Sequence, residues 1–136
     1  MAPREVRVLN GVVVAGYGKA GERLARFHPR IENRTGLERL VPGTLNVRIP
    51  QPYYVTPFAS LTQAEYGYEE VLFERCRVGG LRCLIARPKS HERGEANGPA
   101  YLEIMSDQHL RKVLSLSDGA AVSVEVGGSH RWWMGE

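Results

Sequence analysis

Cysteine and histidine are scarce in this 136-residue chain, and neither is spaced like a set of metal ligands. The two cysteines, Cys76 and Cys83, form no C-x-x-C pair, and the four histidines form neither H-x-x-x-H nor H-x-H. Because structural zinc sites need such clustered ligands, the sequence predicts no zinc site. The cysteines are typical of a reduced cytosolic protein, with a disulfide between facing strands as a geometrically possible alternative.

Long apolar runs are also missing. No stretch approaches 18 consecutive apolar residues, and the N-terminal residues 1–6 contain no apolar signal core. The sequence therefore predicts no membrane-spanning helix and a cytoplasmic location. No arrangement of Ser, His and Asp, or of Cys and His, indicates nucleophilic catalysis. A hydrophobic content of 43% in a chain of this length is sufficient for the core of one domain.

The charge is weakly positive, with a formal net value of +3, and the excess lies near the N-terminus. Such a cluster attracts the phosphates of a small nucleotide or of a nucleic acid, although a solvated mixed surface explains it equally well. No RNA-recognition signature with interleaved aromatic residues accompanies it, which argues against a nucleic-acid partner. The basic residues of this segment are Arg4, Arg7, Lys19, Arg23, Arg26, Arg30 and Arg34.

Short strand-like runs separated by Gly and Pro dominate the rest of the chain. Residues 69–78 and 81–86 flank Gly79-Gly80 and predict a tight hairpin. Val122, Val124 and Val126 alternate with polar residues, so one face of that strand is apolar. Many short strands with few helices indicate a mainly β fold, a small closed barrel with one or two short helices. An open sandwich is the alternative.

The expected helices are short and the expected loops are polar. Residues 22–27 fit one helix, residues 31–40 fit a further helical turn, and Ser106 or Asp107 is expected to cap a helix over residues 108–114. Residues 88–99 are expected to form a mobile surface loop. We assign residues 1–126 to one barrel domain and residues 127–136 to a C-terminal tail, whose Trp132 and Trp133 are expected to pack or to be disordered.

A glycine-rich segment follows the first strand-like run. Its residues Gly16, Tyr17, Gly18, Lys19, Ala20 and Gly21 match G-x-G-x-x-G by letter. No long helix and no alternating β/α pattern follow, and no Gly-Lys-Ser/Thr ends the segment, so neither a Rossmann fingerprint nor a P-loop is indicated. Glycines still allow backbone N–H groups to approach a phosphate closely, and Lys19 adds positive charge. A plain turn is the alternative.

A Pro-Gly turn precedes Thr44 and Asn46, which are two residues apart in a strand-like run. Residues two apart in an extended chain point to the same face. A hydroxyl and an amide carbonyl on one face suit Mg²⁺, which binds few protein groups and keeps water and phosphate as its other ligands. A hairpin start whose polar residues bond the local backbone is the alternative.

Two further sites follow from the strand over residues 101–105. Glu103 is expected on the face opposite Leu102 and Ile104, as a solvated residue or as an acceptor for a ligand hydroxyl or ring N–H. The residues after this strand, Ser106, Asp107, Gln108 and His109, open a helix whose free N–H groups suit an anion or a base edge, or they simply cap it. Arg111, further along the same helix, is expected to be exposed.

Taken in order, these features resemble the archaeal-type CTP-dependent riboflavin kinase family. The resemblance rests on residues 11–18, on Pro42-Gly43-Thr44-Leu45-Asn46-Val47, on residues 102–104 leading into Leu110-Arg111, and on Leu116-Ser117-Asp118-Gly119. It covers roughly residues 6–126, and its Gly-Thr-Leu-Asn segment is the specific part.

The resemblance implies a six-stranded cradle-loop barrel that transfers the γ-phosphate of CTP to the 5′-hydroxyl of riboflavin. It implies that Thr44 and Asn46 hold Mg²⁺, that residues 16–21 and 106–109 bind the nucleotide, and that Glu103 contacts the flavin. We further expect a monomer that acts on small molecules.

The chain departs from the family at three places. Lys19-Ala20 stand where Glu-Gly is usual, and Ser106-Asp107 stand where Ala-Pro is usual. The flavin-contacting threonine would fall near Ser90 or His91, so His91 is the expected substitute. A non-catalytic barrel that binds a nucleotide or flavin is therefore the alternative function.

Overall fold

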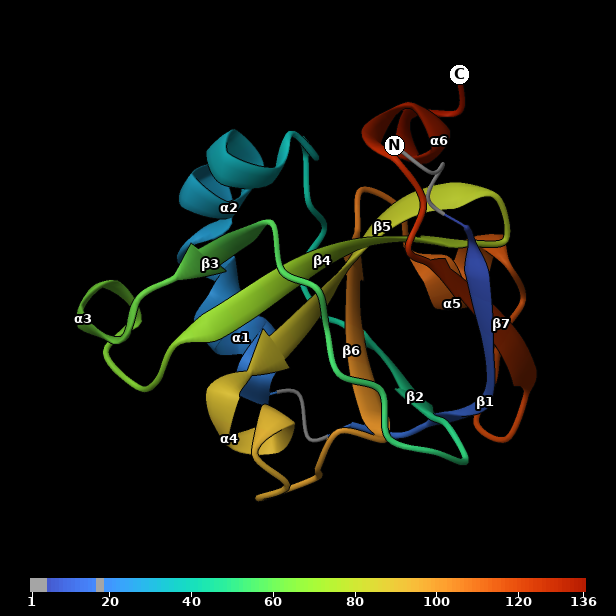
Figure 1. The fold of residues 1–136 in the computed structure, drawn as a ribbon, viewed down its shortest axis with the longest axis horizontal. Coiled ribbons are helices and arrows are strands. Elements are labelled where there is room, and N and C mark those ends of the chain that lie inside the picture. Colours follow the sequence, from blue (N-terminus) through green and yellow to red (C-terminus); the bar gives the residue numbers. More distant parts are fainter. Residues whose placement is uncertain (1–4, 17–18) are drawn as a thin grey trace.

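In the part of the chain that the structure describes, six antiparallel strands close into a barrel, and a seventh, short strand pairs with the edge of β4 (Figure 1). The computed structural model describes residues 5–16 and 19–136. The strands are β1 (Arg7–Val14), β2 (Leu45–Arg48), β3 (Ala59–Leu61), β4 (Val71–Val78), β5 (Leu81–Pro88), β6 (Tyr101–Ser106) and β7 (Ala121–Val126). The helices are α1 (Lys19–Ala25), α2 (His28–Thr35), α3 (Gln63–Tyr66), α4 (Lys89–Glu92), α5 (Leu110–Val113) and α6 (His130–Met134).

The barrel closes through pairing between β4 and β7. The sheet order is β3-β4-β5-β6-β2-β1-β7, and the additional ladder joins Cys76 to Val126 and Val78 to Val124. Closure removes exposed strand edges, which explains why a barrel forms rather than an open sandwich. The predicted hairpin around Gly79-Gly80 is confirmed, since β4 and β5 pair along their full length.

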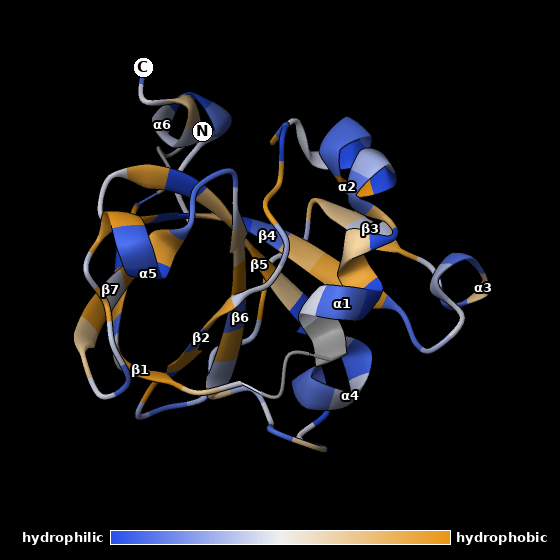
Figure 2. Cartoon of the chain, turned by 180° about the vertical axis from the view of Figure 1, so that it is seen from behind, coloured by the Kyte–Doolittle hydropathy of each residue, from blue (hydrophilic) through white to orange (hydrophobic). Residues whose placement is uncertain are grey.

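Two hydrophobic cores share the strands of this barrel. Leu102 and Ile104 of β6 face the inner core together with Val124 and Val126 of β7, whereas Met105 faces a second core outside the barrel. The predicted alternation of both strands is therefore confirmed. The outer core lies between the sheet and the helices, which expose mostly hydrophilic residues, while the strands carry most of the hydrophobic ones (Figure 2).

The described residues contain six short helices, more than the one or two that were predicted. α1 ends at Ala25, and His28-Pro29 begin α2, because proline is tolerated in the first turn of a helix, where its missing N–H is not needed. α2 ends at Gly36, whose φ of 81° closes the helix in the left-handed conformation.

The predicted capping of a helix by Ser106 or Asp107 is wrong. Ser106 is the last residue of β6, where it pairs with Cys83, and its Oγ accepts the N–H of Gln108 at 3.2 Å. α5 begins only at Leu110, and the side chain of His109 before it makes no capping bond. The strand continues further than expected because Ser106 still has a partner in the neighbouring β5.

The C-terminal residues fold back onto the sheet. In α6, Trp133 is fully buried in the outer core, and its Nε1–H donates to the carbonyl oxygens of Cys76 and Cys83 at 3.1 Å each. Of the two outcomes expected for this tryptophan, packing is the one observed. Cys76 and Cys83 are buried and form no disulfide bond, although they lie directly opposite each other in β4 and β5.

Candidate functional site

Thr44 and Asn46 lie side by side where the chain enters β2. The Thr44 hydroxyl donates to Asn46 Oδ1 over 3.0 Å, and Asn46 is buried. The prediction that both side chains share one face is confirmed. Their two oxygen atoms therefore form a compact pair of hard ligands beside the Pro42-Gly43 turn.

The glycine-rich segment packs directly against this pair. A Cβ atom at Gly16 would lie 1.9 Å from Asn46 Nδ2, and a Cβ atom at Gly21 would lie 2.8 Å from the Cα of Gly43. Real side chains do not tolerate such distances, so glycine is required at both positions for the close approach. Tyr17 and Gly18 lie outside the described residues, as do the side chains of Lys19 and Ala20, which remain predicted nucleotide contacts.

Glu103 lies directly opposite Asn46. The two residues are register partners in the antiparallel ladder of β2 and β6, so their side chains project from the same face. Glu103 is only 7% exposed, and its Oε2 atom has no hydrogen-bond partner among the described residues. It is thus not a solvated surface residue. A buried acceptor without a partner is a feature of sites that await a ligand.

Burial, partly opposed by Arg87 and reinforced by Glu69, raises the pKa of Glu103 to about 7. The carboxyl group therefore changes its charge close to neutral pH. Perturbed carboxyl groups of this kind are concentrated at functional sites. The Tyr66 hydroxyl belongs to the same electrostatic environment, although nothing in the local sequence around Tyr66 indicated this.

His91 contacts Tyr101, which shares a face of β6 with Glu103. Its ring makes a T-shaped contact with Tyr101, with centroids 6.3 Å apart, and Tyr101 is two residues before Glu103 on β6. His91 is buried, its Nδ1 atom has no partner within the described part of the chain, and burial lowers its pKa. The structure thus brings both predicted flavin contacts to one side of β6.

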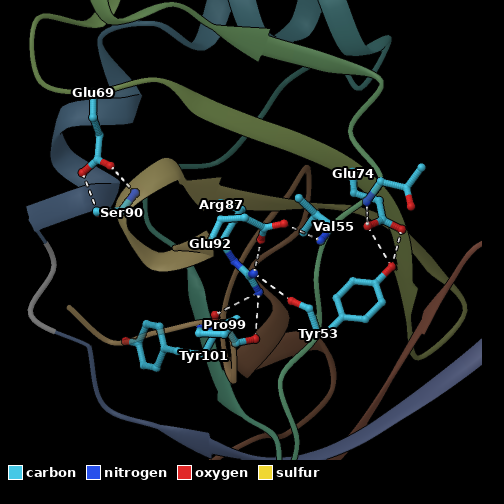
Figure 3. Close-up of polar contacts among 10 residues, drawn as sticks. Tyr53, Val55, Glu69, Glu74, Arg87, Ser90, Glu92, Pro99 and Tyr101 are labelled. Atoms are coloured by element: carbon cyan, nitrogen blue, oxygen red, sulfur yellow. Dashed lines mark hydrogen bonds and ion pairs between the residues drawn. The ribbon is translucent and has the colours of Figure 1, made fainter. Parts of the chain in front are cut away.

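The segment that carries His91 is anchored rather than irregular (Figure 3). The Arg87 guanidinium pairs with Glu92 at 2.5 Å and donates to the carbonyl oxygens of Tyr53 and Pro99 at 2.8 and 3.1 Å. Glu69 accepts the Ser90 N–H at 2.7 Å. The expectation of a mobile loop over residues 88–99 missed these contacts and helix α4, because all of the partners are distant in sequence except Glu92.

A pocket lies beside the Pro42-Gly43 turn that precedes Thr44. It has a volume of about 190 Å³ and is lined by residues 41–45, by Ile104 and Ser106, and by residues 108–111. Three of the four predicted nucleotide contacts at residues 106–109, namely Ser106, Gln108 and His109, thus share a pocket with Thr44. Asp107 does not line it.

Arg111, expected only as an exposed helix residue, connects three parts of the site. Its Nη2 atom donates to the Val14 carbonyl oxygen at 3.2 Å and to Asp118 Oδ1 at 2.7 Å, while the side chain also lines the pocket. Arg111 therefore ties α5 to the end of β1, from which the glycine-rich segment departs.

The chemistry available at this site is that of oxygen ligands and backbone dipoles. No group of three or more His, Cys, Asp and Glu side chains that could hold a metal ion occurs among the described residues. Within the same part of the chain, no helix is sufficiently long and apolar to cross a membrane. The Thr44 and Asn46 oxygens suit a hard cation that also binds the phosphates of a ligand.

Comparison with known proteins identifies the family. The family model CTP-dep_RFKase, which is described as "Domain of unknown function DUF120", matches residues 13–126 and so most of the chain. The chain belongs to this family. The match ends before α6, so the helix that buries Trp133 lies beyond the family's matched region.

Several archaeal proteins named riboflavin kinase are similar to the chain. The protein of Methanocella arvoryzae is 29% identical over 126 residues, with 88% of this chain and 56% of the relative covered. The protein of Archaeoglobus fulgidus is 31% identical over 132 residues, with 88% and 52% covered. The chain thus spans about half the length of these two family members. It covers 98% of the relative from Methanobrevibacter smithii, which is 29% identical over 125 residues.

Proposed function

We propose that the chain is a CTP-dependent riboflavin kinase, which transfers the γ-phosphate of CTP to the riboflavin 5′-hydroxyl and yields FMN and CDP. It acts as a cytoplasmic monomer on small molecules, without a membrane or nucleic-acid partner. One observation carries the proposal: the glycine-rich segment contacts Asn46, and Asn46 lies opposite Glu103. Groups for the phosphates, for a cation and for an acceptor therefore adjoin one another.

Phosphoryl transfer requires little covalent chemistry from the protein. The riboflavin 5′-oxygen forms a bond to the γ-phosphorus, the bond from that phosphorus to the bridging oxygen of CDP breaks, and the hydroxyl proton passes to solvent. Catalysis of this step depends on positioning and on electrostatic stabilisation. The glycine-rich segment supplies backbone N–H groups for the phosphates, and the pocket at Ser106, Gln108 and His109 accepts the rest of the nucleotide.

The oxygens of Thr44 and Asn46 fit Mg²⁺. Their separation of 3.0 Å matches the spacing of about 3 Å between adjacent oxygens around an octahedral ion with bonds of about 2.0–2.1 Å. When bound, Mg²⁺ would neutralise charge on the phosphates. Two neutral protein ligands leave most of the coordination shell for phosphate and water, as is usual for this cation.

Glu103 and His91 face the acceptor. Glu103 accepts a hydrogen bond from a flavin hydroxyl, which satisfies the Oε2 atom that has no partner among the described residues. His91 takes the place at which the family has a threonine. Its neutral ring can donate or accept one hydrogen bond, since burial lowers its pKa.

The test is the conversion of riboflavin to FMN by the purified chain, with CTP, ATP, GTP and UTP in parallel and Mg²⁺ varied. We expect FMN with CTP, and a loss of at least about tenfold in kcat/KM for Thr44→Val at limiting Mg²⁺. Thr44→Ser keeps the hydroxyl and is the matched control, so it should retain most of the activity. Binding of riboflavin and nucleotide without turnover would identify a non-catalytic binding module instead.

A further inference from the structure

A pocket lined by aromatic and basic side chains lies between the C-terminal end of α1 and the turn that joins α3 to β4. Its volume is about 290 Å³, and its lining residues are Arg23, Arg26, Phe27, Tyr66, Gly67 and Tyr68. This size is close to the lower end of small-molecule pockets, about 300 Å³. None of these residues belongs to the metal or nucleotide groups described above.

The side chains of this pocket already form an aromatic cluster. The Phe27 and Tyr66 rings make a T-shaped contact at 5.4 Å, and the Tyr66 and Tyr68 rings make another at 5.1 Å. The Arg23 guanidinium lies over the Tyr68 ring, 4.0 Å from its centroid. Tyr68 is nevertheless 50% exposed, so part of this layer remains available to a ligand. Such a group of aromatic rings and a guanidinium suits a planar, delocalised ligand.

Tyr66 lies between the pocket and the strand that carries Glu103. It lines the pocket, is almost completely buried, and belongs to the outer core that also contains Met105, two residues after Glu103 on the same face of β6. The Tyr66 hydroxyl also interacts electrostatically with Glu103 and with Glu69. A ligand that places a hydroxyl chain at Glu103 can therefore extend its remaining part toward Tyr66 and Tyr68. Riboflavin consists of a flexible ribityl chain and a flat tricyclic ring, in that order from its 5′-hydroxyl.

We propose that the isoalloxazine ring of riboflavin binds in this pocket against Tyr68 and Arg23, while its ribityl chain passes Tyr66 to Glu103. The inference rests on the proposed function and adds the residues that recognise the ring. The guanidinium groups of Arg23 and Arg26 are donors for the two carbonyl oxygens of the ring's pyrimidine edge. The nucleotide base is assigned elsewhere, to the pocket at Gln108 and His109.

The experiment uses lumiflavin, which has the isoalloxazine ring but no ribityl chain, beside riboflavin and CDP. Flavin fluorescence is titrated with the purified chain. We expect lumiflavin to bind, to compete with riboflavin, and to be unaffected by CDP. Tyr68→Ala should weaken both flavins by about tenfold, because one stacking contact of this kind is worth about one to two orders of magnitude in affinity.

Two further variants serve as controls for Tyr68→Ala. Tyr68→Phe keeps the ring and should bind both flavins as the unmodified chain does. Tyr54→Ala removes a tyrosine that is 62% exposed outside the pocket, and it should change nothing. CDP affinity should remain constant in all three variants, which shows that Tyr68→Ala has not unfolded the protein.

Three results overturn the inference. If Tyr68→Ala phosphorylates riboflavin with an unchanged KM, the ring binds elsewhere and the Arg23 contact is only a surface interaction, while the kinase proposal stands. If lumiflavin has no affinity although riboflavin is phosphorylated, the ring contributes no separate site. A chain that neither binds nor phosphorylates riboflavin refutes the kinase proposal and this inference together.

Discussion

Replacement of Trp133 by alanine should destabilise the whole barrel, although this residue lies in the last turn of the chain. Trp133 is fully buried and packs in the outer core that also contains Leu24 of α1, Phe73 of β4 and Met105 of β6. The Arg77 guanidinium holds the helix in place by donating to the Trp133 carbonyl oxygen at 2.9 Å. The C-terminal helix is therefore part of the fold on which the site is built.

The magnitude follows from the size of the group and its complete burial. Removal of a fully buried tryptophan side chain costs about 3–5 kcal/mol, which includes the cavity that is left behind. Such a loss is a large part of a typical unfolding free energy of about 5–15 kcal/mol. Trp133→Phe keeps most of the ring but loses the Nε1–H bonds to Cys76 and Cys83, so it should cost roughly 1–3 kcal/mol.

Urea denaturation followed by circular dichroism measures these differences. Met134→Ala is the matched control, since Met134 belongs to the same helix and is 39% exposed. It should shift the unfolding free energy by less than about 0.5 kcal/mol. If Trp133→Ala unfolds at the same urea concentration as Met134→Ala, the burial of Trp133 does not stabilise the barrel and our reasoning about the tail is refuted.

Three further predictions concern the site. Glu103→Gln should raise the riboflavin KM by about ten- to a hundredfold without changing CDP affinity. Without ligands, the wild type should lose up to roughly 3 kcal/mol of stability relative to this variant as pH rises from about 4.5 to about 7, because the pKa of the carboxyl group is about 7 in the folded state and 4.5 in the unfolded state, which ionises first. Urea denaturation that shows the same pH dependence for both proteins would contradict this. Gly16→Ala should weaken CDP by at least about tenfold in calorimetric titration, because the new Cβ would lie 1.9 Å from Asn46 Nδ2; an unchanged dissociation constant would reduce the segment to a plain turn. Glu92→Ala should cost roughly 3 kcal/mol in urea denaturation, since Arg87 stays buried without its ion-pair partner, and a change below about 0.5 kcal/mol would show that the carbonyl acceptors alone satisfy it.

Local spacing explains which parts of the fold were predictable. A hairpin with Gly79-Gly80 at its tip, an apolar face of alternating valines, and two side chains two residues apart in a strand are all decided within a few residues. For the same reason the shared face of Thr44 and Asn46 was predicted correctly, although their hydrogen bond was not. The glycines at positions 16 and 21 predicted a close backbone approach to a phosphate, but not their contacts with Asn46 and Gly43 within the chain.

The helix after β6 shows where local signals fail. Ser106 and Asp107 are good capping residues by type, yet Ser106 remains in the sheet because Cys83 pairs with it. A cap and a strand end compete for the same backbone groups, and the neighbouring strand decides the outcome. Local signals also fail for the segment after β5. Arg87 donates to the carbonyl oxygens of Tyr53 and Pro99, which are 34 and 12 residues away in sequence.

The sequence by itself determined the strands, their faces and the chemical types available for a site. Only the tertiary structure decided that Gly16 lies against Asn46, that Glu103 lies opposite Asn46 and is buried, and that Trp133 becomes part of the core. The reason is physical. Strand propensity and side-chain alternation act between neighbours along the chain, whereas burial and the pKa of a carboxyl group depend on segments that meet only when the barrel closes.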